Sequence, residues 1–146
     1  MTTSIHKSAL VAYTPAEMFA LVSDIGSYAD FLPWCRSAQV LWQGEDELKA
    51  SIEMAKGSLH KSFTTHNRHQ RDKMIEMRLV EGPFKRLEGY WRFDPLGDKA
   101  CKVSLDLEFE FANRMLSLMI GPVFSQIANT LVDAFQQRAV QVYGKR

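Results

Sequence analysis

The stretch Asn113–Tyr143, NRMLSLMIGPVFSQIANTLVDAFQQRAVQVY, carries the longest periodic pattern in the chain. Its apolar residues recur in steps of three and four, which places them on one stripe of an α-helix. The stripe comprises Leu116, Ile120, Val123, Phe124, Ile127, Leu131, Phe135, Ala139 and Val142. Because a helix of this length cannot cover its own apolar stripe, the pattern predicts that it lies across a broad apolar surface. Within it, Gly121-Pro122 predicts a kink or a restart.

The residues before this helix predict that surface as a meander of about six antiparallel strands. Between Arg36 and Phe111 apolar and polar residues alternate with a period of two, including a strand near residues 58–69. Short segments rich in glycine, proline and charge interrupt the alternation and predict turns. From Cys101 to Phe111 the alternation has no exception, which is typical of a strand with one buried and one solvated face.

The N-terminal part predicts a strand over residues 3–13 and then two short helices. In Thr14-Pro15-Ala16-Glu17, threonine can cap the first helix, proline suits its first position, and glutamate can complete a capping box. A second short helix is predicted from Ser23-Asp24 through Tyr28. The order of elements indicates one α+β domain over residues 1–146.

Composition excludes several classes of protein. The chain has 146 residues, 46% of them hydrophobic, and a formal net charge of +1, so no global field favours nucleic acid or a membrane surface. Its two cysteines, Cys35 and Cys101, form no C-x-x-C motif and are expected to be reduced structural thiols. No signal peptide or run of about 18 apolar residues is present, which predicts a soluble, cytoplasmic protein.

Catalytic signals in the sequence are weak. It contains no G-x-S-x-G, no glycine-rich phosphate loop and no H-E-x-x-H. His66 and His69 are three residues apart on a predicted strand, which sends them to opposite faces, so we expect surface histidines and no metal site. We therefore predict a non-enzymatic protein with no catalytic residues and no catalytic cofactor.

A local excess of basic residues falls in one predicted hairpin. It comprises Lys56, His60, Lys61, His66, Arg68, His69, Arg71 and Lys73, offset along the chain by Asp72. Such a hairpin is typical of a hydrated edge that resists aggregation. It also suits a phosphate backbone, including ribosomal RNA, for which the candidate contacts are Lys61, Arg68, Arg71 and Lys73.

Three segments resemble a known family, in the right order and over nearly the whole chain. YADFLPWC (Tyr28–Cys35), VEGPFKRLEGYWRF (Val80–Phe93) and GPVFSQIANTLVDAFQQRA (Gly121–Ala139) are similar to the coenzyme Q-binding START-domain family, and most to a bacterial branch that includes ribosome-association toxins. The resemblance implies a helix-grip fold, with a seven-stranded antiparallel sheet around the long C-terminal helix and a tunnel between them. It also implies binding of ubiquinone or a related polyprenyl quinone in support of respiratory electron transport.

The resemblance also implies where the ligand binds. The expected tunnel residues are Phe31, Leu32, Trp34, Phe84, Leu87, Trp91, Val123, Ile127 and Leu131, with Met54 added from the predicted lining of the sheet. The FLPW loop and the Gly82-Pro83-Phe84 turn are candidates for the mouth, either as a gate or as a plug of the core. Candidate donors to a quinone head are Tyr28, Trp34, Arg86 and Tyr90. Periodicity alone leaves open whether helix and sheet enclose a cavity or pack solid.

The bacterial branch implies a second function, binding to the large ribosomal subunit so that the small subunit cannot join it. The basic hairpin is the predicted surface for that contact. The expected partners are thus a hydrophobic small molecule and the large ribosomal subunit, with transient membrane contact and no DNA. The expected location is the cytoplasm, including the periphery of the inner membrane.

Overall fold

A computed structural model describes residues 2–57 and 59–146. Its elements follow the predicted order, with two short helices after the first strand and the longest helix last. They are β1 (Thr3–Val11), α1 (Pro15–Ser23), the 3-10 helix η1 (Ile25–Asp30), β2 (Cys35–Gly44), β3 (Glu47–Lys56), β4 (Leu59–Gln70), β5 (Met74–Glu81), β6 (Phe84–Pro95), β7 (Cys101–Phe111) and α2 (Arg114–Tyr143). The first residue of the strand predicted at 58–69, Ser58, lies outside the described residues.

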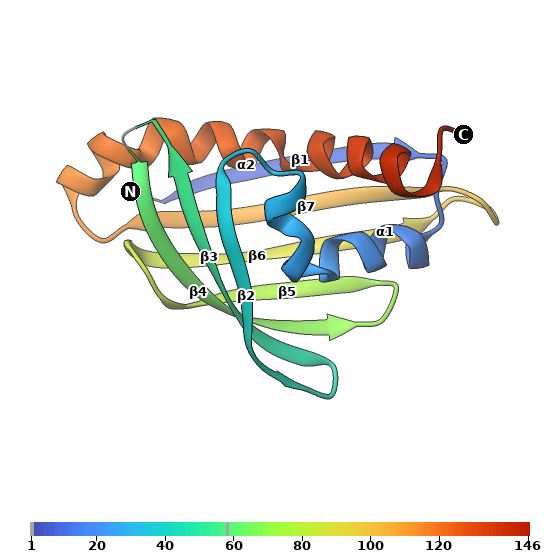
Figure 1. Ribbon diagram of the computed structural model, residues 1–146, viewed down its shortest axis with the longest axis horizontal. Coiled ribbons are helices and arrows are strands. Elements are labelled where there is room, and N and C mark those ends of the chain that lie inside the picture. The colour runs from blue at the N-terminus through green and yellow to red at the C-terminus, as the bar shows by residue number, and fades with distance from the viewer. Residues whose placement is uncertain (1, 58) are drawn as a thin grey trace.

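The strands form one antiparallel sheet in the order β1-β7-β6-β5-β4-β3-β2, a meander closed by β1 beside β7. Figure 1 shows β6 and β7 running along α2, whereas β2, β3 and β4 cross its direction obliquely. The helix packs on β7 and β1 and contacts α1. This is the predicted α+β helix-grip arrangement of seven strands around a C-terminal helix.

The short helix α1 begins as its sequence predicts. The Glu17 amide donates to Thr14 Oγ1 at 3.1 Å, and the Thr14 amide donates to Glu17 Oε1 at 2.9 Å, which completes the capping box. The Arg146 guanidinium also donates to the Glu17 carboxylate, at 2.7 and 2.8 Å. The hydrogen bonds that the carboxylate accepts from Arg146 and from the Thr14 amide lower the pKa of Glu17 to about 2, and the Arg146 bonds tie the end of the chain to α1.

The long helix α2 is continuous through Pro122, so the predicted restart is wrong. Pro122 is exposed, and water can satisfy the Leu118 carbonyl that loses its helical donor there. Asn113 caps the helix by accepting from the Leu116 amide at 2.9 Å. The helix α2 is also long and apolar enough to cross a membrane, because one 18-residue window has a mean hydropathy of 1.4. Its inner stripe, however, is buried against the sheet.

Most of the predicted stripe faces the sheet. The buried residues of α2 are Ile120, Phe124, Ile127, Ala128, Val132, Phe135 and Ala139. Val142, predicted on the stripe, is 48% exposed, because Tyr143 turns inward instead and donates from its hydroxyl to the Glu17 carbonyl at 2.9 Å. On β7 all six predicted inward residues between Cys101 and Phe111 are buried.

Candidate ligand-binding cavity

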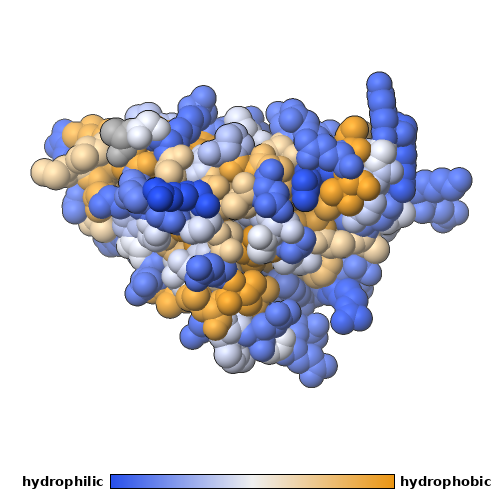
Figure 2. All heavy atoms as spheres, in the orientation of Figure 1, coloured by the Kyte–Doolittle hydropathy of each residue, from blue (hydrophilic) through white to orange (hydrophobic). Residues whose placement is uncertain are grey.

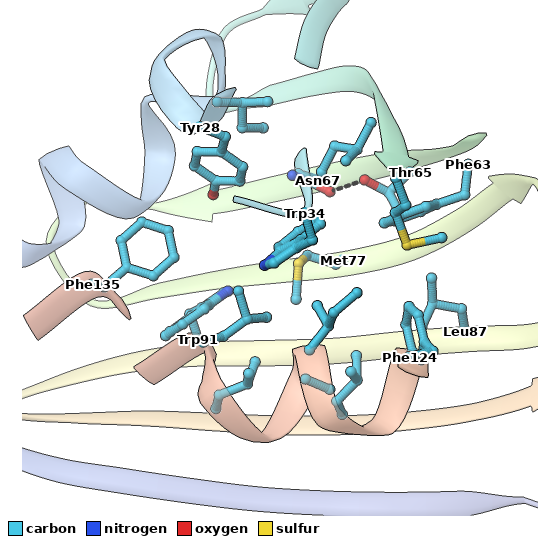
Figure 3. Close-up of a pocket in the computed structure, with 18 residues that line it drawn as sticks. Tyr28, Trp34, Phe63, Thr65, Asn67, Met77, Leu87, Trp91, Phe124 and Phe135 are labelled. Carbon is cyan, nitrogen blue, oxygen red and sulfur yellow. Dashed lines mark hydrogen bonds between the residues drawn. The ribbon is translucent and has the colours of Figure 1, made fainter. Parts of the chain in front are cut away.

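An apolar cavity of about 90 Å³ lies between α2 and the sheet. Figure 3 shows Phe124 and Phe135 extending from the helix on one side and Thr65 and Asn67 from β4 on the other. The lining residues are Ile25, Tyr28, Trp34, Ile52, Met54, Phe63, Thr65, Asn67, Met77, Leu87, Trp91, Leu105, Leu107, Phe124, Ile127, Ala128, Leu131 and Phe135. Helix and sheet therefore do not pack solid.

The structure brings part of the predicted tunnel set to this cavity. The residues that line it are Trp34, Met54, Leu87, Trp91, Ile127 and Leu131. The other four predicted residues lie elsewhere: Phe31 and Leu32 in a separate groove outside the cavity, Phe84 inside the core, and Val123 partly buried against that core. Periodicity indicated which residues are apolar and inward, but not how deep each side chain lies.

Phe84 belongs to an aromatic cluster beyond one end of the cavity. Its ring stacks on Phe111 with centroids 5.1 Å apart and meets the Phe124 ring edge-on at 4.9 Å. Phe124 also packs at 4.8 Å from Phe109, and Phe63 lies 6.0 Å from Phe84. Because Phe84 is only 5% exposed, the structure favours the plug alternative over a gate for the Gly82-Pro83-Phe84 turn.

Two polar residues in the cavity wall were missed by the sequence reasoning. Thr65 and Asn67 are buried on the inward face of β4, and the Thr65 hydroxyl donates to Asn67 Oδ1 at 2.8 Å (Figure 3). The Asn67 amide nitrogen has no acceptor among the described residues. The period of two from Phe63 through Thr65 to Asn67 was the available signal. The wall thus offers a hydrogen-bond donor within an apolar surface.

The predicted head-group donors divide between two faces of the sheet. Tyr28 and Trp34 line the cavity. The Tyr28 hydroxyl donates to the Val22 carbonyl, and burial raises the pKa of Tyr28, so its phenol is neutral and already engaged. Arg86 and Tyr90 lie on the opposite side of β6 from the inward Leu87 and Trp91 and do not line the cavity, so the structure does not support them as donors to a head group bound there.

A second hollow of about 360 Å³ lies between the loop after η1 and the outer side of α2. Its lining is more polar: Phe31, Leu32, Pro33, Trp34, Lys56, Gln126, Ile127, Thr130, Asp133, Ala134, Gln137, Arg138 and Gln141. We call it the outer groove. Lys56 Nζ donates to Gln126 Oε1 at 3.2 Å, and the Arg138 guanidinium lies 4.8 Å from the centre of the Phe31 ring. Two cations therefore stand beside this groove.

The size of the two hollows limits what each can hold. Ligand pockets in proteins commonly measure about 300–1,000 Å³. The inner cavity is too small for a quinone with an isoprenoid tail, whereas the outer groove alone lies at the lower end of that range. Among residues 2–57 and 59–146, only Trp34 and Ile127 line both hollows.

In the folded protein, acidic side chains from a neighbouring strand offset part of the positive charge of the basic hairpin. Arg68, Arg71 and Lys73 lie near the β4–β5 turn, whereas Lys61 lies towards the other end of β4. The neighbouring strand β3 supplies acidic partners: His60 pairs with Glu53 at 2.5 Å and His66 with Glu47 at 3.1 Å. The expectation that Asp72 alone offsets this charge is wrong, because the register of β3 against β4 is not visible in local sequence.

His66 and His69 point to opposite faces of β4, as their spacing predicts. His69, however, is not a solvated histidine. Its Nε2 is buried without a hydrogen-bond partner among the described residues, and its ring meets Phe19 edge-on at 5.5 Å. Burial lowers the pKa of His69, which keeps the ring neutral. Within residues 2–57 and 59–146 no group of three or more side chains is placed to hold a metal ion.

The sequence of this chain is similar to those of several known proteins. The chain is 49% identical over 144 residues to the ribosome association toxin RatA of Pseudomonas aeruginosa, covering 99% of this chain and 100% of that protein. It is 24% identical to the mitochondrial coenzyme Q-binding protein COQ10 homolog B of Xenopus laevis, covering 96% of this chain and 59% of that one.

Solved structures share the fold at lower identity. The Zhui aromatase/cyclase of Streptomyces matches with a TM-score of 0.83 and 16% identity over 100% of both chains. The curated relatives are thus named as a toxin and as a binding protein, whereas this structural neighbour is a cyclase. A family model described as polyketide cyclase / dehydrase and lipid transport matches residues 11–136. The chain belongs to this polyketide cyclase / dehydrase and lipid transport family.

Proposed function

We propose that this chain is a ribosome-associating protein that binds the large subunit and opposes subunit joining. The observation that carries the proposal is the 49% identity, over nearly the full length of both chains, to a protein named ribosome association toxin. Arg68, Arg71 and Lys73 are exposed at the β4–β5 turn and form the candidate contact with ribosomal RNA. Lys61 stands apart from them, towards the other end of β4, and is left out of this contact.

The test is co-sedimentation with purified large subunits over a range of salt concentrations. Wild-type protein should bind with a steep salt dependence, and Arg68→Glu/Arg71→Glu/Lys73→Glu should release it. The matched control, Lys7→Glu/Lys99→Glu/Lys102→Glu, makes the same change of charge at other exposed positions. Equal binding of both variants would remove the β4–β5 turn as the contact surface, and absence of wild-type binding would remove the ribosomal proposal.

We infer a second function, binding of a hydrophobic ligand, with a polyprenyl quinone as the first candidate. It is supported by the apolar cavity under α2 and by the distant similarity to a protein named coenzyme Q-binding. Thr65, Asn67 and the engaged Tyr28 are the hydrogen-bonding groups of the wall, together with the indoles. The described residues of this wall include no carboxylate and no histidine that could act as a general acid or base, which suits binding better than catalysis.

The ligand test is extraction and native mass spectrometry of protein purified gently from its own cells. A co-purifying ubiquinone or menaquinone supports the inference and identifies the ligand. Leu131→Trp fills the cavity from α2 and should abolish binding of added quinone while the protein stays folded. Val140→Trp, at a half-exposed position on the same helix, is the control. Unchanged quinone affinity in a folded Leu131→Trp protein would contradict the site.

A further inference from the structure

The first two turns of α2 expose three large apolar side chains to solvent. Met115, Leu118 and Met119 are 70%, 70% and 68% exposed, more than most other large hydrophobic residues described. Figure 2 shows hydrophobic atoms gathered at the end of the molecule where α2 begins in Figure 1. We call Met115, Leu118 and Met119 the helix tip. Isolated exposed leucines are common, but three such neighbours on one helix surface form a patch.

The spacing of the tip sets it apart from the buried stripe. Residues 115, 118, 119 and 122 share the side of the helix that faces away from Ile120 and Phe124. After Pro122 the outward side becomes polar, with Gln126, Asn129 and Asp133 all exposed. The apolar outer face is therefore confined to about 12 Å at one end of the helix.

Two exposed cations, Arg114 and Lys85, lie beside the tip, with the acid Glu81 on the other side of Pro83. Arg114 begins the helix and is exposed, and the first turn contains no acidic residue. The Ala112 amide donates to the Pro83 carbonyl at 2.9 Å, which brings the start of β6, with the exposed Lys85, alongside. Lys85 is paired with Glu110 at 3.5 Å, a length at which an exposed pair is weak. Apolar side chains rimmed by cations complement an anionic lipid surface.

On the inner side of the same helical turns, a cluster of buried apolar side chains extends to the cavity. Ile120 packs in one cluster with Phe84, Phe111 and Phe124, and Phe124 also lines the cavity. The tip and the cavity thus lie on two sides of a single aromatic cluster. A hydrophobic ligand that leaves a bilayer at the tip would have to pass these rings and would not have to cross water.

We propose that the helix tip is a membrane-docking surface that inserts Met115, Leu118 and Met119 into the interface of an anionic bilayer. The role of docking in delivering a ligand rests on the proposed ligand-binding function, whereas docking itself does not. The tip side chains carry no hydrogen-bond donor, so they suit the boundary between headgroups and acyl chains. A ribosomal RNA backbone would instead require a cluster of cations.

The test is flotation of the intact protein with vesicles of phosphatidylcholine and phosphatidylglycerol. Met115→Gln/Leu118→Gln/Met119→Gln keeps good helix formers at exposed positions, so folding should be preserved. We expect its partition coefficient to fall on the order of 100-fold. The control Leu10→Gln/Val140→Gln/Val142→Gln removes three exposed apolar side chains, with Leu10 near the far end of β1, and should partition as wild type.

Each outcome decides the proposal. Failure of the wild-type protein to float, or equal flotation of the tip variant, overturns it. Loss of ribosome binding by the tip variant, with no vesicle binding by wild type, would assign the tip to the ribosome instead. Leu131→Trp should float normally, because it alters only the cavity. A vesicle-binding protein without quinone affinity would therefore keep the docking proposal and remove the ligand.

Discussion

Trp34 and Ile127 lie on the boundary between the inner cavity and the outer groove, and each of these residues lines both hollows. The backbone of Trp34 is fixed, because its carbonyl accepts from the Ala55 amide at 2.8 Å and the next amide, of Cys35, donates to the Leu32 carbonyl at 3.0 Å. The indole can therefore open the boundary only by changing its side-chain torsions. Such a change would join an apolar cavity to a groove with Lys56 and Arg138 beside it.

Shortening this side chain should open the boundary permanently. We predict that Trp34→Leu binds an environment-sensitive apolar dye more tightly than wild type, and that its unfolding free energy falls by about 1–3 kcal/mol. The measurements are a fluorescence titration and urea unfolding. Trp42→Leu, at a half-exposed position on the edge strand β2, is the control and should leave dye binding unchanged. Weaker dye binding by Trp34→Leu would contradict a boundary role.

The Thr65–Asn67 pair should behave as a coupled unit. Asn67→Leu leaves the buried Thr65 hydroxyl without its acceptor, so the unfolding free energy should fall by about 1–3 kcal/mol. In Thr65→Val/Asn67→Leu no unpaired hydroxyl remains, and the loss should be smaller than the sum of the two single changes. Urea unfolding of the four proteins gives the coupling energy. Additive losses would show that the hydrogen bond does not matter to the fold.

His69 should make stability depend on pH. Because burial lowers its pKa in the folded protein, the unfolded chain takes up a proton first as the pH falls below about 6.5. Stability contributed by the neutral ring is thus present above that pH and is lost as the pH falls towards the folded pKa. His69→Leu should reduce the difference in unfolding free energy between about pH 7.5 and pH 5.5. An unchanged difference would assign the pH dependence to other groups.

The fold could be predicted because its signals are local. The alternation from Cys101 to Phe111 and the cap at Thr14 depend on near neighbours in the chain, and the structure confirms both. The site could be predicted only in part. Whether a cavity remains beside Leu131 depends on the summed volumes of side chains from strands that are distant in sequence. Asn67 was not predicted in the cavity wall because its polar side chain faces inward. The acids that offset the basic hairpin likewise come from another strand.

A substitution of Phe84 can distinguish whether the Gly82-Pro83-Phe84 turn plugs the core or acts as a gate for a ligand. The Phe84 ring contacts four other phenylalanines, and the adjoining turn is tightly packed: Gly82 has φ +151°, and a Cβ there would lie 2.7 Å from the Phe63 Cβ. A plug should carry a large share of the stability, so Phe84→Ala should lower the unfolding free energy by about 3–5 kcal/mol. Phe31→Ala, at a partly buried position beside the outer groove, should cost less. A gate would instead show a small stability loss with faster exchange of bound dye, measured by stopped-flow release. Because the rings of Phe84, Phe111 and Phe124 pack against one another, we expect the large loss of stability and no faster release of dye.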